Sequence, residues 1–263
     1  MLVYDQPEMY QVTVKTVQYQ TLSQPPKMLS MDIYYPPGWQ PGSRLPAVLF
    51  ANDFPLRSKF GKCGRTCYTY PSWGRLVAAN GLIAVTYDSE QFTDLEAVAE
   101  HVRSNGADLG IDGDRLGVMG VSSDAALALS FSYQANRDYV KFVVIYYGYL
   151  LTPDNVMRDE FNKAGLEADF YAAELPDVRQ LRTDLPTLIV RCGRDHSLDL
   201  ISTDHFVQLA QQAGVPLTLI RFDDGRHSFD EKVISVVGQI KVEAIAVIQQ
   251  TLEFMKAHVA DQQ

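Results

Sequence analysis

The sequence predicts an α/β protein built on a mostly parallel β-sheet with helices on both faces. Short apolar, β-branched runs alternate with longer segments of helical periodicity through most of the 263 residues, a pattern typical of βαβ units. Four consecutive runs are apolar without alternation, as expected of strands that are covered on both faces. The composition, 46% hydrophobic and 21% charged, is that of an ordinary globular protein and excludes a disordered or collagen-like chain.

The first two strands are expected at an antiparallel edge of this sheet. The segments at residues 9–19 and 28–35 alternate polar and apolar residues and are separated by Pro25 and Pro26. This alternation predicts a pair of antiparallel strands with one exposed face. Six further strands are predicted at residues 45–51, 81–88, 114–121, 141–147, 186–193 and 216–223.

Helices and two insertions separate the predicted strands. Residues 52–74, after the third strand, are long for a routine βα loop. Residues 149–185 are acidic and weakly periodic, and we expect them to form a small helical cap. Neither insertion has the length of a domain, so we expect residues 1–263 to form a single domain. Helical periodicity is found at residues 73–80, 94–105, 123–134 and 203–214, and in a closing region at residues 232–259 that is interrupted near Gly238.

The charge of the chain argues against polyanionic partners. It has 23 Lys and Arg against 32 Asp and Glu, a formal net charge of -9, whereas nucleic acids and anionic membranes bind basic surfaces. No signal peptide is recognised at the N-terminus, and the longest apolar run is about half of a bilayer span. Of three cysteines, Cys63 and Cys67 are close enough in sequence to pair, but with Cys192 they are too few for a disulfide framework. We therefore expect reduced thiols in a cytoplasmic protein without a membrane partner.

A serine follows the fifth predicted strand at the start of a helix. Gly120, Ser122 and the small residues Ala125 and Ala126 have the spacing of a nucleophile elbow, in which strand and helix approach so closely that the flanking residues must be small. Such a turn presents the hydroxyl at a helix N-terminus, where the backbone N–H of Ser123 can donate to an oxyanion. A serine at such a junction is also a common helix N-cap, so this segment alone leaves both roles open.

An acid and a histidine follow later strands in the order that the elbow requires. Asp195 comes directly after the seventh predicted strand, and His227 lies in the loop after the eighth. The order Ser122, Asp195, His227 is that of a Ser–Asp–His triad on this kind of sheet. His227 would accept the proton of Ser122, and Asp195 would orient the imidazole and stabilise its cation. Taken singly, Asp195 could be a helix N-cap and His227 a loop histidine bonded to the backbone.

A metal site is the alternative use of these acids and histidines. It would be formed by Asp195, His196 and Asp199, or by Asp223, Asp224 and His227. No HxxEH-like or Cys/His spacing supports a metal, so we expect none. His101, His205 and His258 fall in predicted helices and have no predicted role.

With these motifs in place, the chain resembles the α/β-hydrolases of the dienelactone hydrolase and acetyl esterase type. The resemblance is carried by AVLFAND, LGIDGDRLGVMGVSSDAALALS, DLPTLIVRCGRDHSLD and TDHFVQLAQQAGVPLTLIRFDDGRHSFD, and covers most of residues 29–258 except the cap. It implies the α/β-hydrolase fold and ester hydrolysis through an acyl-enzyme, without metal or organic cofactor. Matching positions assign Ser122 as nucleophile, Asp195 as acid and His227 as base.

Two positions depart from the pattern of that family. Asp124 stands where similar enzymes usually have Gly; at ~7 Å and an effective dielectric of about 20 it would repel an oxyanion by ~2.4 kcal/mol. We expect it instead to point away and cap the helix, where a negative charge is favourable by up to ~1 kcal/mol. A His-Gly-type segment after the third strand is replaced by Asn52, Asp53 and Phe54. The second oxyanion donor is therefore expected to be a backbone N–H of one of residues 52–54, next to that of Ser123.

The residue 52–74 insertion suggests the class of substrate. It contains four basic residues against Asp53, and its aromatic residues include Phe54, Tyr70 and Trp73. These three side chains are expected to line the pocket, for an ester or lactone with an anionic or aromatic portion. The alternative is that the charges of this basic loop have no role in substrate binding and only attract the acidic residues of 149–185.

Two other functions stay open at this stage. One is a peptidase of the prolyl-oligopeptidase kind, although the propeller or other N-terminal module of those enzymes is not recognised here. The other is a catalytically silent binding protein that uses the same pocket. The oligomeric state is also open, a homo-oligomer included.

Overall fold

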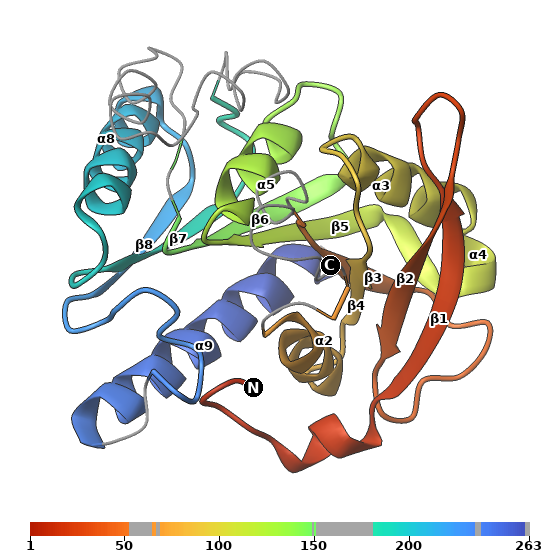
Figure 1. Cartoon of the computed structure of the whole chain (residues 1–263), viewed down its shortest axis with the longest axis horizontal. Helices are drawn as coiled ribbons and strands as arrows, with labels where there is room; N and C mark the ends of the chain where they lie inside the picture. The colour runs from red at the N-terminus through yellow and green to blue at the C-terminus, as the bar shows by residue number, and fades with distance from the viewer. Residues whose placement is uncertain (53–64, 67–68, 149, 151–180, 235–237, 261–263) are drawn as a thin grey trace.

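Eight strands form one mixed sheet in the computed structural model of the chain, in the order β1-β2-β4-β3-β5-β6-β7-β8 (Figure 1). The structure describes all residues except 53–64, 67–68, 149, 151–180, 235–237 and 261–263. β1 and β2, and likewise β2 and β4, pair antiparallel, and the other five pairs are parallel. This arrangement confirms the predicted α/β class, the mostly parallel sheet and its antiparallel N-terminal edge.

Each predicted strand is present, and burial explains its sequence pattern. β1 at the edge is largely exposed, whereas β4 in the interior is buried at every position. Full burial on both faces requires continuous apolar sequence, and single-sided burial requires alternation. The strands are β1 Thr13–Gln20, β2 Met28–Tyr35, β3 Leu45–Phe50, β4 Ile83–Tyr87, β5 Ile111–Val121, β6 Val140–Tyr146, β7 Thr187–Cys192 and β8 Leu217–Phe222.

Helices cover both faces of the sheet (Figure 1). The short helix α4, Gly106–Leu109, precedes β5. A 3₁₀ helix, η1 at Pro7–Gln11, lies next to α2. One face carries α3 Asp94–Ser104, α5 Asp124–Ser132 and α8 Ser197–Ala213, and the other carries α2 Tyr70–Ala79 and α9 Gly238–Val259.

Three helix starts differ by three or more residues from the sequence-based prediction. α8 begins at Ser197, six residues before the predicted start, because His196 has extended backbone and ends the preceding loop there. α2 begins at Tyr70 instead of residue 73. α9 begins at Gly238, the predicted point of interruption, instead of at residue 232. Most of the predicted cap, residues 149–185, lies outside the described residues.

Two apolar clusters, one on each face of the sheet, hold these layers together. Leu95 of α3 and Phe206 of α8 belong to one cluster, and Trp73 of α2 and Ile248 of α9 to the other. Every residue of α5 is buried, which explains its nearly uniform apolar and small composition. Burial of each large apolar side chain stabilises the fold by ~1.5–3 kcal/mol, so the central helix α5 is fixed firmly against β5 and β6.

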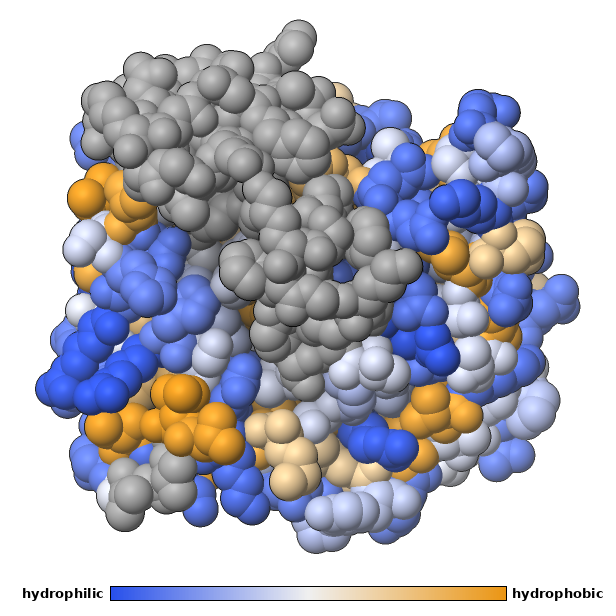
Figure 2. Space-filling model, in the orientation of Figure 1, coloured by the Kyte–Doolittle hydropathy of each residue, from blue (hydrophilic) through white to orange (hydrophobic). Residues whose placement is uncertain are grey.

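Among the described helices, none is both long and apolar enough to cross a bilayer. Figure 2 shows hydrophilic residues over much of the visible face, with smaller apolar patches between them.

Candidate active site

The parallel strands end at one edge of the sheet, and the loops that follow β5, β7 and β8 meet there. Ser122 follows β5, Asp195 follows β7 and His227 follows β8. Ligands of open α/β sheets bind at this edge, beyond the carboxyl ends of the strands.

Ser122 occupies a strained turn between β5 and α5. Its φ of 54° lies in the left-handed region, which non-glycine residues rarely adopt. Its backbone N–H donates to the carbonyl of Tyr146 at 3.0 Å, and its carbonyl accepts from the N–H of Ala125 at 3.2 Å. The N-cap of α5 is Ser123 and not Ser122.

Two glycines allow the close approach that this turn needs. A Cβ at Gly120 would lie 2.6 Å from the Cβ of Ala128 and 2.6 Å from the carbonyl oxygen of Asp124. A Cβ at Gly148, after β6, would lie 2.2 Å from the Cβ of Ala125 and 2.5 Å from the carbonyl oxygen of Ser122. Real Cβ atoms do not approach so closely, so the turn is fixed by the absence of side chains on either side of it.

The structure brings Ser122, His227 and Asp195 into one chain of hydrogen bonds. The Ser122 hydroxyl oxygen lies 2.8 Å from Nε2 of His227, and Nδ1 of His227 lies 2.8 Å from Oδ1 of Asp195. The same Oδ1 accepts the backbone N–H of His196 at 2.8 Å. The Asp195 side chain is 2% exposed and that of His227 27%. The histidine is therefore open to solvent on one side and held by a nearly buried carboxylate on the other.

Opposing influences act on the pKa of His227. Burial of the ring lowers its pKa, but the hydrogen bond to Asp195 and the charges of Asp195 and Asp199 raise it. The net direction is upward from the ordinary histidine value. Because these carboxylates favour the cation, the ring is prepared to receive a proton.

A second carboxyl group, that of Asp199, also faces His227. Its Oδ2 lies 3.6 Å from Nδ1 of His227, and it comes from the first turn of α8. Burial and the neighbouring charge of Asp195 raise the pKa of Asp199 to about 6. The only role predicted for Asp199 from the sequence was that of a ligand in the alternative metal site. Its position in the first turn of a helix that follows Asp195 is the signal that could have placed it at the histidine.

The buried carboxyl group of Asp230 anchors the loop that carries His227. Asp230 is completely buried, and its carboxylate accepts hydrogen bonds from Nε1 of Trp73 at 2.7 Å and from the hydroxyl of Tyr147 at 2.5 Å. The Tyr147 ring lies 4.9 Å from that of His227, centroid to centroid. Burial raises the pKa of Asp230. Asp230 could not be recognised from the sequence, because an acid three residues after a histidine gives no sign that it is buried.

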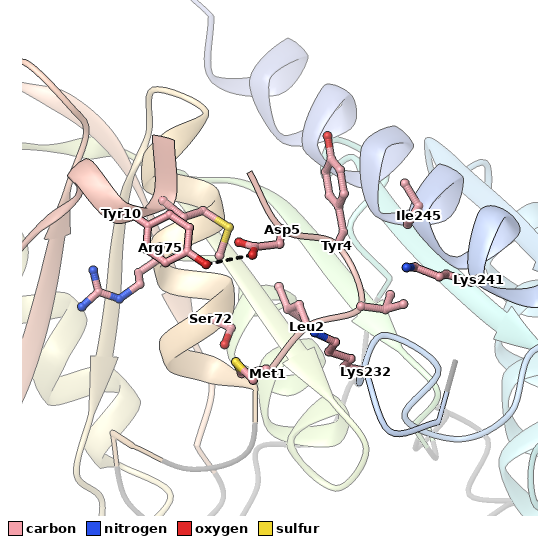
Figure 3. A pocket seen from close by; sticks show the side chains of 12 residues that line it. Met1, Leu2, Tyr4, Asp5, Tyr10, Ser72, Arg75, Lys232, Lys241 and Ile245 are labelled. Carbon is pink, nitrogen blue, oxygen red and sulfur yellow. Dashed lines mark hydrogen bonds between the residues drawn. The ribbon is translucent and has the colours of Figure 1, made fainter. Parts of the chain in front are cut away.

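A pocket of about 200 Å³ opens beside the serine and the histidine. Described residues on four segments line it: Thr69, Val121, Ser122, Ser123, Tyr147, His227, Ser228 and Glu231. A larger cavity, about 820 Å³, lies between the N-terminal segment, α2 and α9, and its lining includes Tyr10, Arg75 and Lys241 (Figure 3). Because neither Ser122 nor His227 lines the larger cavity, the smaller pocket is the one that the hydrogen-bonded group can serve.

Three residues assigned to the site from the sequence make other contacts in the structure. Tyr70 and Trp73 were expected to line the pocket, but both side chains are buried, because the inner face of α2 packs against the sheet. The Tyr70 hydroxyl donates to the carbonyl of Ala51 at 2.7 Å and to the carboxylate of Asp124. The backbone N–H of Asn52, a candidate oxyanion donor, instead donates to the hydroxyl of Tyr87 at 3.1 Å. Among the described residues, these two side chains and this N–H therefore have partners inside the protein.

Asp124 is buried beneath the elbow. It is the first residue of α5, and no part of its side chain is exposed. Its carboxylate is bonded to the hydroxyl of Tyr70 on α2. The acid in place of the usual glycine therefore ties α5 to α2.

Several other expectations fall on residues outside the described part of the chain. These are Asp53 as an oxyanion donor, Phe54 as a pocket residue and the pairing of Cys63 with Cys67. Arg65, a described residue of the basic loop, has its guanidinium against the carboxylates of Asp32 and Asp88. That cation is thus paired within the protein.

The sheet order, the strand–turn–helix at Ser122 and the helices on both faces define an α/β-hydrolase fold. A model of the dienelactone hydrolase family matches residues 78–259. The match spans more than half of the chain, and the protein belongs to this family. Membership indicates a hydrolase. No curated protein matches the sequence.

Solved structures with a similar fold include esterases and a peptidase. A thermostable esterase from Pseudomonas putida has a TM-score of 0.70 at 18% identity, over 97% of this chain and 86% of that chain. A bacterial heroin esterase has a TM-score of 0.70 at 14% identity, over 98% and 88%. Prolyl oligopeptidase B from Galerina marginata has a TM-score of 0.69 at 13% identity, over 95% of this chain but 37% of its own length. At such identities the likeness establishes the fold alone.

Proposed function

We propose that this protein is a serine hydrolase that cleaves a carboxylic ester, lactone or other acyl group, with Ser122 as nucleophile, His227 as general base and Asp195 as the acid that orients it. The observation that carries the proposal is the pair of 2.8 Å contacts linking Ser122 to His227 and His227 to Asp195. The strained φ of Ser122 adds to it, because such strain persists only where the surrounding structure enforces it.

The reaction proceeds in two halves. His227 takes the hydroxyl proton of Ser122 at Nε2 as the oxygen attacks the carbonyl carbon, and then gives this proton to the departing alcohol. The imidazolium formed in between is stabilised by Asp195 at Nδ1. Water then attacks the acyl-enzyme, with His227 again taking and returning a proton, and the acid product leaves.

The negative charge on the tetrahedral intermediate requires hydrogen-bond donors next to Ser122. Ser123 is the N-cap of α5 and lines the pocket, so we assign its backbone N–H as the first donor. Since Asn52 uses its N–H on Tyr87, we assign the second donor to the N–H of Asp53. Asn52 itself holds the start of that loop through its side-chain amide, which donates to the carbonyl of Tyr87 at 2.8 Å.

The described pocket favours a short, neutral acyl group. Its volume of about 200 Å³ is below the ~300–1,000 Å³ typical of sites for drug-sized ligands. Besides His227, the one Asp, Glu, Lys, Arg or His among its described lining residues is Glu231, whose carboxylate would repel that of a substrate. The basic residues of the 52–74 insertion suggested an anionic ester. Recognition of such an ester would therefore depend on residues 53–64.

A panel of p-nitrophenyl esters, thioesters and lactones tests this proposal. We expect hydrolysis of short neutral esters, with kcat/KM falling as the acyl chain lengthens, and loss of activity in Ser122→Ala. Peptide anilides test the peptidase alternative, and their preferred cleavage would favour it. Equal kcat/KM for matched neutral and carboxylate-bearing esters would exclude discrimination by charge. Activity retained in Ser122→Ala would contradict the assignment of the nucleophile.

A further inference from the structure

Four side chains that can bind a metal ion converge on the side of His227 that faces away from Ser122. They are those of Asp195, His196, Asp199 and His227, and one potential ligand atom from each lies within 4.8 Å of all the others. Two come from the loop after β7, one from the first turn of α8 and one from the loop after β8. Catalysis as proposed above uses only two of the four.

The geometry of the group suits a small ion. Nδ1 of His227 lies 2.8 Å from Oδ1 of Asp195 and 3.6 Å from Oδ2 of Asp199. The rings of His196 and His227 lie 5.2 Å apart, centroid to centroid. Tetrahedral zinc with ligand bonds of ~2.0–2.2 Å separates its ligands by about 3.4 Å. All four ligand atoms already lie within 4.8 Å of one another, so no pair exceeds that spacing by more than about 1.4 Å.

The charges of the group favour a cation. Asp195 and Asp199 are adjacent carboxyl groups, and among the described residues neither forms an ion pair with a lysine or arginine. His227 is within ion-pairing distance of both. Asp199 is 9% exposed, so water screens this charge poorly. His196 is exposed and provides a path by which an ion can enter.

We propose that Asp195, His196, Asp199 and His227 form an inhibitory binding site for a divalent transition-metal ion, best suited to Zn²⁺. Two imidazoles and two carboxylates are ligands of zinc, cobalt, nickel and copper. Mg²⁺ and Ca²⁺ prefer six or more oxygen ligands and would bind weakly. The inference concerns regulation of the proposed hydrolase, and so it rests on that function only for the effect on activity.

Inhibition follows from the tautomer of His227. A neutral imidazole carries one ring proton, and an ion at Nδ1 uses the lone pair there, so the proton must be on Nε2. Nε2 is the atom 2.8 Å from the Ser122 hydroxyl. With a proton on Nε2, the ring cannot accept the serine proton, and Asp195 is withdrawn from its orienting role.

The first test is inhibition of the enzyme by ZnCl₂, compared with MgCl₂, for the wild type and two histidine variants. We expect Zn²⁺ to inhibit and Mg²⁺ to have no effect. His196→Ala should raise the half-inhibitory Zn²⁺ concentration at least ~10-fold, since even loss of an outer-sphere contact to a bound metal costs ~10–100-fold in affinity. His205→Ala, on α8 but outside the cluster, is the control and should match the wild type. Each rate is taken relative to the metal-free rate of that variant.

The second test does not need activity. Ser122→Ala protein is titrated with ZnCl₂ by calorimetry and with CoCl₂ by visible absorption. One ion per chain, with an intense cobalt band typical of four ligands, is expected, and both signals should weaken in Ser122→Ala/His196→Ala. Absence of binding, or binding that is unaffected by His196→Ala, would overturn the site. Should the protein prove not to be a hydrolase, this titration would still decide whether the metal binds.

Discussion

The serine turn and the histidine loop meet in one 2.8 Å contact, but they are held in place in opposite ways. The turn is fixed by shape: Gly120 and Gly148 leave no room for a Cβ, and α5 is buried along its whole length. The histidine loop is fixed by buried polar contacts, in which Asp230 accepts hydrogen bonds from Trp73 and Tyr147. One half of the site depends on packing, and the other on satisfied hydrogen bonds.

This difference has a physical reason. The serine must keep a strained φ, and only close backbone packing resists its relaxation. The histidine ring must keep its orientation, which packing alone does not fix but hydrogen bonds do. The two halves should therefore respond differently to substitution.

The largest expected effect is a loss of activity on substitution of Asp195, which orients His227 toward Ser122. Asp195→Asn keeps the shape of the side chain but presents an amide to Nδ1, which favours the wrong tautomer of His227. The expected loss in kcat is ~10⁴-fold, as for the equivalent change in other serine hydrolases. Thermal unfolding should change little, so a large loss of stability would mean that Asp195 has a mainly structural role.

Next in size is loss of the polar support of the histidine loop. Asp230→Ala leaves the indole N–H of Trp73 and the hydroxyl of Tyr147 buried without an acceptor, at about 1–3 kcal/mol for each donor. Urea unfolding should show a decrease of ~2–6 kcal/mol in the free energy of unfolding. Phe229→Leu, at the adjacent buried position, is a packing control with a smaller expected loss of about 1–1.5 kcal/mol. Equal losses in the two variants would show that the loop is held by packing as well.

The shape of the turn is tested at Gly148. An added methyl would lie 2.2 Å from Ala125, so Gly148→Ala should push the elbow out of place and destabilise the fold by ~1–3 kcal/mol. Activity should fall much more than stability, because Ser122 loses its alignment with His227. Gly42→Ala is the control for backbone strain. Gly42 is exposed and has a positive φ, and no atom lies within 4 Å of the added Cβ, so this variant has strain without crowding. A Gly148→Ala enzyme with normal kcat would refute the packing argument.

The smallest effect is a pH dependence of stability. Because the pKa of Asp230 is raised in the folded protein above its ordinary 3.8, the folded state binds its proton more tightly than the unfolded state. The resulting stability is complete below about pH 3.8 and declines as the pH rises through the folded-state pKa. Asp230→Asn is neutral at every pH, so its free energy of unfolding should lack this decline. Parallel pH profiles for the two proteins would contradict the assignment.

The same contrast explains which parts of the structure could be predicted from the sequence. Strands such as Ile83–Tyr87 and the small residues around Ser122 leave a local pattern, and their positions were predicted correctly. Tyr70 and Trp73 were assigned to the pocket because aromatic residues in a loop suggest a binding surface. They are buried because α2 begins earlier than its periodicity indicated.

Long-range polar contacts leave no such pattern. The contact of Asp230 with Trp73 joins residues 157 positions apart, and nothing local to either residue indicates it. The approach of Asp199 to His227 depends on where α8 begins, which was predicted six residues too late. Order along the chain placed Ser122, Asp195 and His227 at one edge of the sheet, but their mutual distances came only from the folded structure.

The central claim, that Ser122 is a nucleophile activated by His227, is tested most directly by a fluorophosphonate probe and intact mass spectrometry of the folded protein. We predict one adduct per chain on Ser122, with no labelling of Ser122→Ala and much slower labelling of His227→Ala. Circular dichroism of each variant confirms that it is folded. Absence of an adduct on folded wild-type protein would contradict the account and would favour a catalytically silent binding protein of the same fold.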